Sequence, residues 1–287
     1  MDAIVCISEY QRQELLKACP WLNPAKVHQH WVGIDKDKIA SAVSANPKVP
    51  KRVLYASSYD RGLAQLLEMW PQVKEQVPDA ELHVTYGWDF WKRSEAVVSQ
   101  PIAESMRQER KRIEGLLDQS GVTHLGRIPH ADVLKEFAEA EVWAYPCTGG
   151  ELCCKTALEA QAAGCEPVVV PTMALAETVQ QGYKVPPCDF LSTLIQAIKV
   201  FGISPPLVGI AITPSWNDLA RWAWILIESR TPQHGNFEVG PVQAEETKLP
   251  ERFSVPHCAS EPPTRQLSIL MAVQRSEERR VGKECRL

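Results

Sequence analysis

The sequence predicts an α/β fold in which a parallel sheet is flanked by helices. Between residues 50 and 228, short apolar runs alternate with longer amphipathic stretches, which is the pattern of strands alternating with covering helices. The apolar runs are continuous, as expected of strands that are buried on both faces. The composition agrees, because 45% hydrophobic and 23% charged residues are ordinary for a globular protein.

These two periods place the elements along the chain. The expected strands are 52–56, 81–85, 122–125, 141–145 and 167–170, and the expected helices are 62–77, 102–119, 131–140, 154–163, 175–181, 190–200 and 216–227. At the amino end, a strand at 3–8 leads into a helix at 9–18. Residues 203–213 fit neither period, and no element is predicted there.

The totals exclude several classes of function. A net charge of −4 and a pI near 6.0 give no reason to expect a nucleic-acid partner. No apolar run approaches the ~20 residues that span a membrane, and no basic leader opens the chain. Nine cysteines without paired C-x-x-C motifs argue against a zinc framework and suit a reducing compartment. We therefore expect a cytoplasmic protein with no transmembrane segment.

The segment from Tyr145 to Gly164 carries the strongest chemical signal. Its order is strand, glycine-containing turn and helix, with Glu151 on the turn and Glu159 in the helix. Free backbone N–H groups at a helix N-terminus, together with the helix dipole, form a phosphate site. Glu159 would lie about one turn into the helix, where its carboxylate can accept two hydroxyl hydrogen bonds, as a ribose would offer.

Each carboxylate also has an ordinary interpretation. Glu151 could complement the helix dipole, which is worth about 0.3–1 kcal/mol, and Glu159 could be a solvated residue of the helix face. Taken one at a time, these ordinary interpretations are the stronger ones. The sequence around the pair makes the functional interpretation of both carboxylates the stronger one.

The block resembles the E-x7-E motif of retaining GT-B glycosyltransferases of family 4, the glycosyl transferases group 1. Other segments resemble the same family in the same order along residues 1–228, among them Gly33-Ile-Asp35, Arg61-Gly62-Leu63, the strand that begins at Glu81, and Val122-Thr-His-Leu-Gly126. The resemblance implies that the sheet is the Rossmann-like C-terminal lobe of a GT-B fold. An isolated E-x7-E would be a weak signal, whereas the ordered series is a strong one.

The resemblance also implies roles for individual residues. Glu159 would bind the ribose hydroxyls, while Glu151 and Arg61 would be the catalytic residues at the transferred sugar and the diphosphate. The remaining donor-binding residues would be Ser57, Ser58, Gly62, Thr148, Gly149, Gly150 and Leu152, with Gly126, Arg127 and Ile128 near the base. The donor would be a UDP-, GDP- or ADP-sugar, and no metal or cofactor is expected.

The sequence departs from the family pattern at two places. Relatives often have Gly-Arg after the first strand and Lys before the glycine, whereas this chain has Ala56-Ser57-Ser58 and then Arg61. One expected cation is therefore missing, so the phosphate site is weaker or built differently. The motif interior reads Leu152-Cys-Cys where relatives often have a glycine-containing turn.

Four further patterns have more ordinary interpretations. Asp35-Lys36-Asp37 matches a D-x-D metal motif, but carboxylates at a helix start are favoured. His124 and His130 are expected to be structural or solvated, with a substrate hydroxyl as the sharper alternative. The aromatic residues Tyr86, Trp88, Phe90 and Trp91 favour core or lid packing over sugar stacking. The doublet Cys153-Cys154 favours small buried side chains over a reactive role.

The resemblance divides the chain into parts. Residues 1–20 would be a remnant of the N-terminal GT-B lobe, 21–49 an interdomain segment, and 50–228 a nucleotide-sugar-binding Rossmann-like domain. Residues 229–274 are rich in Pro, Gln and Glu and are expected to form a mobile, disordered C-terminal tail. Residues 275–287 resemble a translated sequencing adapter and are set aside.

The predicted function is hexosyl transfer from a nucleoside diphosphate sugar with retention, of which this chain is mainly the donor-binding half. Because relatives form the acceptor site from the N-terminal lobe, which we expect to be largely missing here, the chain alone should be weak or inactive. Two alternatives stay open. One is a non-catalytic sugar-nucleotide-binding subunit that needs a partner N-terminal domain; the other is a nucleotide-binding protein whose binding ignores the sugar.

Overall fold

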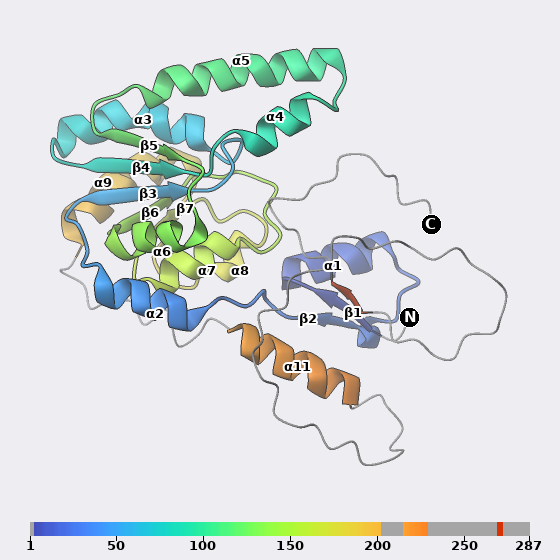
Figure 1. Ribbon diagram of the computed structural model, residues 1–287. Coiled ribbons are helices and arrows are strands. Elements are labelled where there is room, and N and C mark those ends of the chain that lie inside the picture. Colours follow the sequence, from blue (N-terminus) through green and yellow to red (C-terminus); the bar gives the residue numbers. More distant parts are fainter. Residues whose placement is uncertain (1–2, 202–214, 229–268, 272–287) are drawn as a thin grey trace.

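The computed structural model describes residues 3–201, 215–228 and 269–271. These residues form a six-stranded sheet with helices on both faces and a smaller three-stranded sheet beside it (Figure 1). The predicted α/β class with a parallel, helix-flanked sheet is confirmed. Residues 203–213, for which no element was predicted, and most of the expected tail lie outside the described residues.

The six-stranded sheet changes its direction of winding at its centre. All its neighbouring strands are parallel, in the order β5-β4-β3-β6-β7-β8. The chain adds β4 and β5 on one side of β3 and then returns to add the later strands on the other, so that the loops after β3 and β6 lie at the switch point of the sheet. The strands are β3 (Arg52–Ala56), β4 (Glu81–Thr85), β5 (Val122–Gly126), β6 (Val142–Tyr145), β7 (Glu166–Val169) and β8 (Tyr183–Lys184).

Helices cover both faces of this sheet (Figure 1). One face carries α3 (Leu63–Gln76), α5 (Gln100–Leu117) and α9 (Phe190–Val200), and the other carries α2 (Lys36–Ala45), α6 (His130–Glu139) and α7 (Lys155–Ala162). Two short helices complete the layers: α4 (Asp89–Glu95) lies against α5, and α8 (Leu175–Thr178) lies against α7.

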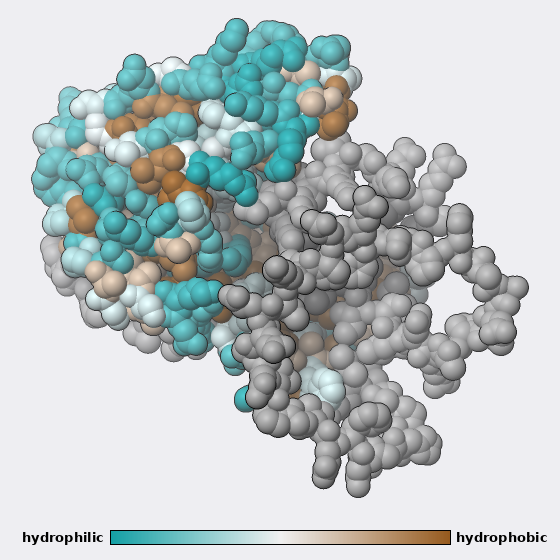
Figure 2. Space-filling model, viewed as in Figure 1, coloured by the Kyte–Doolittle hydropathy of each residue, from teal (hydrophilic) through white to brown (hydrophobic). Residues whose placement is uncertain are grey.

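The core explains why the central strands read as continuous apolar runs. Leu54 and Tyr55 of β3 and Trp143 and Tyr145 of β6 are all completely buried, because helices cover both of their faces. Helix α5 shows the opposite case. It buries Ala103 and a few other apolar residues and exposes charged ones, and Figure 2 shows hydrophilic side chains gathered over this helix.

Helix α7, which follows the loop after β6, is deeply buried. Residues 157–162 are all buried, including Glu159 and Gln161. A helix that is buried all round is found in the interior of a domain rather than on its surface. The small side chains of Ala157, Ala160 and Ala162 allow this close packing. The packing places the Glu159 carboxylate in the core.

The three-stranded sheet joins the two ends of the chain. It has the order β2-β1-β9, built from β1 (Ala3–Cys6), β2 (Val27–Gln29) and β9 (Ile269–Met271), with all pairs parallel. The predicted strand and helix at the amino end are confirmed as β1 and α1 (Glu9–Ala18). Residues 269–271 lie within the expected tail, and there they form β9 beside β1.

The first turn of α1 is tied to the six-stranded domain. The Ser8 side chain accepts from the backbone N–H of Gln11, as an N-cap does. Glu177 of α8 accepts from the N–H groups of Glu9 and Tyr10, at 3.2 and 3.1 Å. A carboxylate at a helix N-terminus is stabilised by the helix dipole, so this contact links the small sheet to the loop after β7.

The last described helix, α11 (Trp216–Glu228), begins beside residues 33–34. Ile34 and Ser215 form a parallel bridge. A Cβ on Gly33 would lie 2.6 Å from the Trp216 nitrogen, so only glycine permits this approach. Among the helices of the described residues, none combines the length and apolar character that crossing a membrane requires.

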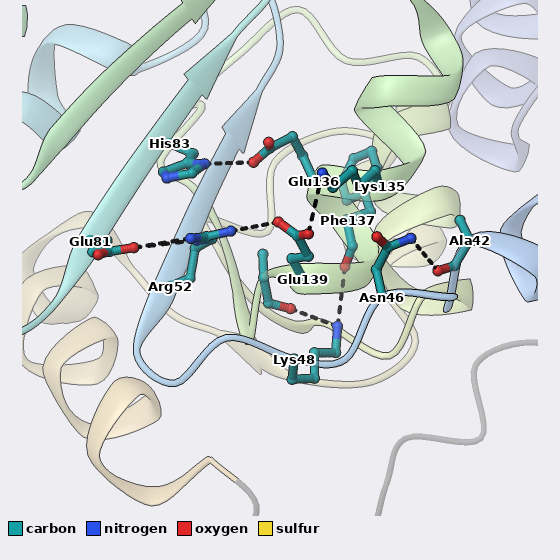
Figure 3. Close-up of polar contacts among 11 residues, drawn as sticks. Ala42, Asn46, Lys48, Arg52, Glu81, His83, Lys135, Glu136, Phe137 and Glu139 are labelled. Carbon is teal, nitrogen blue, oxygen red and sulfur yellow. Dashed lines mark hydrogen bonds and ion pairs between the residues drawn. The ribbon is translucent and has the colours of Figure 1, made fainter. Parts of the chain in front are cut away.

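Lys48 joins the amino edge of the six-stranded sheet to the ends of two helices (Figure 3). Its Nζ donates to the carbonyl oxygens of Phe137 (3.1 Å) and Ala140 (2.6 Å), at the end of α6, and of Ala163 (3.0 Å), after α7. The last carbonyls of a helix have no partner inside the helix, and a cation there also complements the dipole. Lys48 therefore caps the carboxyl ends of both helices.

A second set of contacts at this edge connects β3 and β4 with α6 (Figure 3). Arg52 lies between Glu139 (2.6 Å) and Glu81 (3.2 Å). His83 Nδ1 lies 2.6 Å from a carboxylate oxygen of Glu136. These side chains contact one another, so we assign them to holding α6 on the sheet.

Helices α2 and α4 and strands β2 and β8 were not predicted, and one predicted helix ends early. Helix α4 and strands β2 and β8 are short, so their periodicity is weak. Helix α2 begins at an N-cap, Asp35, whose side chain accepts from the Lys38 N–H. The helix expected over 175–181 ends at Thr178, because the Gln161 side chain accepts from the N–H groups of Gln180 and Gln181.

Candidate functional site

The candidate site lies at the carboxyl edge of the sheet, where the loops after β3 and β6 meet. A Cβ on Gly62 would lie 2.8 Å from the carbonyl group of Pro146, so the two loops touch at a glycine. Gly62 has a φ of 92°, which is readily available only to glycine. The contact places the turn before α3 directly beside the segment from Pro146 to Cys154.

Glu151 and Arg61, predicted as the catalytic pair, are in direct contact. Arg61 Nη1 lies 3.1 Å from Glu151 Oε1 and 3.3 Å from the Gly149 carbonyl oxygen. Both side chains are largely buried, at 15% and 13% exposure. Burial lowers the pKa of Arg61, but the charge of Glu151 and the other groups around it, among them Tyr145 and Asp60, together outweigh this and raise it, so the guanidinium stays charged.

Tyr145 also donates a hydrogen bond to Glu151. Its hydroxyl donates to the same oxygen of Glu151 at 2.5 Å, and Ser57 Oγ lies 3.1 Å from the Tyr145 oxygen. Tyr145 is the last residue of β6 and is fully buried. Burial raises its pKa well above the usual value of 10, so the phenol keeps its proton and donates.

Glu159 has a second set of partners on the other side of the loop. Lys155 Nζ and His130 Nε2 lie 2.6 and 2.9 Å from its Oε1. Glu159 is 3% exposed, so the ordinary interpretation of a solvated helix-face residue is wrong. Burial raises its pKa, but the hydrogen bond from His130 and the charge of Lys155 outweigh this and lower it.

The helix that carries Glu159 begins one residue after its predicted start at residue 154. Helix α7 begins at Lys155, after Cys154 in a left-handed conformation with a φ of 48°. The expected phosphate ligands Gly149, Gly150 and Leu152 therefore precede the helix by several residues. The free N–H groups of a helix lie in its first turn, here at Lys155 and after.

The loop after β7 lies against this segment. The Gly150 N–H donates to Met173 Sδ at 3.2 Å, and Thr172 Oγ1 donates to the Thr148 carbonyl oxygen at 3.3 Å. A Cβ on Gly150 would lie 2.7 Å from Arg61 Nη1. Two of the predicted diphosphate ligands, the Gly150 N–H and the Arg61 guanidinium, are thus occupied by groups of the protein itself.

The two serines after β3, Ser57 and Ser58, make hydrogen bonds near Arg61 and Glu151. Ser57 contacts Tyr145, and the Ser58 carbonyl oxygen accepts from the Tyr55 hydroxyl (2.7 Å) and from the Arg61 N–H (3.0 Å). Ser57 is therefore part of the Glu151 network. Ser58 fixes the turn that carries Arg61.

The predicted base-side loop lies farther along the edge, after β5. Gly126 has a φ of 64°, and its carbonyl oxygen accepts from the Tyr86 N–H at 2.9 Å. Arg127 lies 3.8 Å from Asp89 and is 46% exposed, and Ile128 is partly buried. This loop leads directly into His130 and so into the contact with Glu159.

The histidines and aromatic residues confirm the packing interpretation. The Tyr59 hydroxyl lies 2.7 Å from His124 Nε2 and accepts from the Gly87 N–H, and burial lowers the pKa of His124. Trp88 makes edge contacts with Tyr59 and Trp91 at 4.6 and 5.7 Å between ring centroids. The aromatic cluster packs the loops after β3, β4 and β5 together.

Two other expectations are also settled by geometry. Asp35 is the N-cap of α2, which confirms the helix-start interpretation of the D-x-D match. Cys153 and Cys154 are buried, and burial raises the pKa of Cys153 to about 11. In the parts of the chain that the structure describes, no three His, Cys, Asp or Glu side chains gather in a way that would hold a metal ion.

Sequence reasoning missed three residues of the site: Tyr145, Lys155 and Met173. Lys155 had a usable signal, because it stands four residues before Glu159 and such pairs face each other on a helix. Tyr145 was treated only as the end of a strand. Met173 comes from a loop distant in sequence, and no local pattern indicates its contact with Gly150.

Comparison with known proteins adds the family. The model of the family "Glycosyl transferases group 1" matches residues 50–201. Phosphatidyl-myo-inositol mannosyltransferases of Mycobacterium tuberculosis and Mycobacterium bovis are 28% identical over 155 residues, which is 52% of this chain and 36% of theirs. The chain thus spans little more than a third of the length of these curated relatives.

Solved structures of glycosyltransferases share the fold. A Rickettsia africae glycosyltransferase has a TM-score of 0.60 at 15% identity, covering 79% of this chain and 63% of that one. Anabaena HepE, in complex with UDP and glucose, has a TM-score of 0.59 at 15% identity with the same coverage. Sucrose-phosphate synthase of Thermosynechococcus elongatus has a TM-score of 0.57 at 20% identity, covering 79% and 58%. The architecture is thus that of GT-B glycosyltransferases, and the chain belongs to the glycosyl transferases group 1 family.

Proposed function

We propose that the chain binds a nucleoside diphosphate sugar at the carboxyl edge of its six-stranded sheet and contributes this donor site to hexosyl transfer with retention. The observation that carries the proposal is the pair of charged clusters on either side of the loop after β6. Glu151 with Arg61 lies on one side, and Glu159 with His130 and Lys155 lies on the other. Both stand at the switch point of the sheet, where open α/β sheets bind ligands.

The diphosphate would lie between Arg61 and the start of α7. A guanidinium binds phosphate oxygens bidentately, and the first turn of α7 presents backbone N–H groups and the positive end of its dipole. The Gly150 N–H would join them once it leaves Met173. Thr148, Gly149 and Leu152 would shape the loop that carries these groups.

The ribose would lie against Glu159. Its carboxylate is fixed by Lys155 and His130 through one oxygen, Oε1. Positioning a carboxylate in this way directs it toward hydroxyl donors without leaving it a mobile charge. Gly126, Arg127 and Ile128, which precede His130, would then lie near the base.

The same groups would act on the reaction itself. As the bond to the sugar breaks, negative charge grows on the departing diphosphate, and Arg61 with the helix N–H groups would stabilise that charge. Glu151 would contact the transferred sugar or its phosphate. We propose no metal and no cofactor for this step, and the leaving phosphate would take the acceptor's proton.

Solved relatives support this placement of the donor, and the cysteines support the proposed location. Anabaena HepE has been solved with UDP and glucose, and the pneumococcal O-GlcNAc transferase GtfA, which has a TM-score of 0.53 to this chain, with UDP and GlcNAc. The described cysteines are all free thiols, which suits the reducing cytoplasm that we propose as the location.

The second candidate is a sugar-nucleotide-binding subunit that works with a separate N-terminal lobe. It is favoured by the position of the proposed donor groups, because all of them lie within residues 50–201, which the family model matches. In either case we expect little transfer to an added acceptor by this chain alone. Rapid transfer by the purified chain would contradict both the subunit role and the donor-half interpretation.

Thermal-shift titration tests the proposal. UDP, GDP, ADP and their sugar conjugates would be titrated against the wild type, since a ligand at 100 times its Kd stabilises the folded state by about 2.7 kcal/mol. Glu159→Gln should lower the affinity of the selected nucleotide about tenfold, because a neutral amide is a weaker acceptor of hydroxyl hydrogen bonds than a carboxylate. Glu141→Gln, a partly buried carboxylate at the amino edge, is the matched control.

The outcome is decided by two comparisons. A melting point that no nucleotide raises would overturn the proposed function. A nucleotide that stabilises Glu159→Gln as much as the wild type would leave a nucleotide-binding protein whose site lies elsewhere. Equal affinity for a nucleoside diphosphate and all its sugar conjugates would favour the reading in which binding ignores the sugar.

A further inference from the structure

Among the contacts described for Glu151, two donors of different kinds hold its carboxylate. Arg61 is a cation, and the Tyr145 hydroxyl is neutral, yet both donate to the same oxygen, Oε1, at 3.1 and 2.5 Å. The Tyr145 contact is the shorter one. The two donors also reach Glu151 from different directions along the chain, one from the loop after β3 and one from the end of β6.

The tyrosine is built into the sheet, whereas the arginine lies on a turn. The Tyr145 ring is completely buried and stacks on Trp143 at 4.9 Å with an interplanar angle of 20°. Its oxygen also lies 3.1 Å from Ser57 Oγ. Because the phenol donates its single proton to Glu151, Ser57 must be the donor to the phenol oxygen, and a chain of donors runs from Ser57 through Tyr145 to Glu151.

The proposed function requires Arg61 to change partners. An incoming diphosphate would take hydrogen bonds that Arg61 now gives to Glu151 and to the Gly149 carbonyl oxygen. Glu151 would then face a second anion with less of its counter-charge. A largely buried carboxylate that loses its partner costs far more than one that keeps a hydrogen bond.

We propose that Tyr145 is a positioning residue that holds and stabilises Glu151 while Arg61 turns to the diphosphate. This role rests on the proposed function and deepens it. The tyrosine is suited to the role because a neutral hydroxyl does not compete for the diphosphate, and because the rigid ring keeps its oxygen in place. Ser57 strengthens the donation, since hydrogen bonds in a chain polarise one another.

The test is a double-mutant cycle measured by calorimetric titration of the full chain. The ligands are UDP, which would reach Arg61, and uridine, which has no phosphate; GDP with guanosine, or ADP with adenosine, replaces them if the thermal-shift panel selects that base. Tyr145→Phe should weaken UDP binding about tenfold and leave uridine binding unchanged. In a Glu151→Gln background, the same substitution should change UDP binding less than twofold, because a neutral amide needs no compensating donor.

Two further variants separate this role from general damage to the core. Tyr55→Phe removes another fully buried hydroxyl, which donates to the Ser58 carbonyl oxygen and not to Glu151; it should lower the melting point without showing the coupling to Glu151. Ser57→Ala leaves the Tyr145 ring in place and should weaken UDP binding in the same direction by a smaller factor, which keeps the test available if Tyr145→Phe folds poorly.

The outcomes are distinguishable. If wild type binds UDP and Tyr145→Phe binds it equally well, the positioning role is wrong and the proposed function stands. If UDP and uridine weaken together, or if the effect persists in the Glu151→Gln background, Tyr145 is merely structural and the role is again wrong. If the wild type binds no nucleotide, the proposed function fails and this role fails with it.

Discussion

The amino and carboxyl edges of the six-stranded sheet both carry dense polar networks, and Lys48 at the amino edge differs from Arg61 and Lys155 at the carboxyl edge in its main partners. At the amino edge, Lys48 donates to three backbone carbonyl oxygens at the ends of α6 and α7. At the carboxyl edge, Arg61 and Lys155 contact the side-chain carboxylates Glu151 and Glu159. Backbone carbonyls fixed in helix ends cannot leave their partners, whereas carboxylate contacts can be exchanged for a ligand.

The backbone shows the same difference. Among the described residues, four non-glycine residues have positive φ, and three of them, Tyr86, Cys154 and Met173, follow β4, β6 and β7 at the carboxyl edge. Such conformations cost free energy and tend to persist at functional sites. The comparison teaches that Lys48 at one edge holds helix ends together, while Arg61 and Lys155 at the other edge are the residues that we propose bind the ligand.

The largest expected effect breaks the amino edge alone. Lys48→Met leaves the carbonyl oxygens of Phe137, Ala140 and Ala163 without their cation, so the free energy of unfolding should fall by about 2–4 kcal/mol. The affinity of the folded protein for UDP should stay unchanged. Urea denaturation and calorimetry measure the two quantities.

Lys51→Met is the matched control for this variant. Lys51 Nζ pairs only with the exposed Asp79 among the described contacts, and such surface pairs contribute about 0–1 kcal/mol. If Lys48→Met is no less stable than Lys51→Met, the amino-edge network does not have the role assigned to it.

The next effect compares the two edges through one type of substitution. Gly150 and Gly164 have φ of 79° and 74°, so alanine at either should cost about 1–2 kcal/mol of stability. At Gly150 the new Cβ also lies 2.7 Å from Arg61 Nη1, whereas at Gly164 the nearest atom is 4.0 Å away on Lys48. Gly150→Ala should therefore lose UDP affinity, about tenfold, and Gly164→Ala should not.

This comparison is checked by measuring stability and UDP affinity for both variants. Equal losses of stability with a loss of affinity at Gly150 alone would sharpen the distinction between the edges. Unchanged UDP affinity in Gly150→Ala would show that Arg61 does not reach the ligand.

The smallest effect concerns stability at acid pH. The pKa of Glu159 is lowered from 4.5, so its contribution to stability is present above that value and is lost as pH falls through its folded pKa. The pKa of Glu141 is raised by burial, so its charge costs stability at neutral pH, and the cost disappears as pH falls through the raised value. Glu159→Gln should flatten the loss of stability below pH 4.5, and Glu141→Gln should remove a gain of stability that the wild type makes just above pH 4.5.

Each change should be about 1 kcal/mol or less, since one pKa unit corresponds to ~1.4 kcal/mol. Urea denaturation at a series of pH values from neutral to acid measures both. Two variants with the same acid limb as the wild type would show that neither carboxylate differs between its folded and unfolded states as described.

The fold was largely predictable, because both faces of the sheet are covered and the strands are therefore apolar throughout. The start of β3 at Arg52 and the end of β6 at Tyr145 matched the expected bounds. The elements that were missed, such as β8 and α4, are short and depend on tertiary contacts. The pairing of β9 with β1 joins residues at opposite ends of the chain, which no local pattern can indicate.

The sequence predicted that Glu151 and Arg61 share a site, but it did not predict the partners of Glu159. The contact of Arg61 with Glu151 and the placement of both at the switch point agree with the expected grouping. The burial of Glu159 was not foreseen, because a glutamate in a helix is ordinarily exposed and only the contacts with His130 and Lys155 make burial tolerable. The occupation of the Gly150 N–H by Met173 depends on a loop distant in sequence.

The central claim is that the charged and backbone groups at the carboxyl edge exchange internal partners for a nucleoside diphosphate. Methyl NMR of methionine-labelled protein tests it most directly, because Met173 Sδ accepts from Gly150 while Met69 and Met106 pack against the core. The Met173 signal, identified by its loss in Met173→Leu, should shift and saturate on titration with UDP and stay in place with uridine. Saturable UDP binding that leaves the Met173 signal unmoved, or moves Met69 and Met106 as much, would contradict the claim.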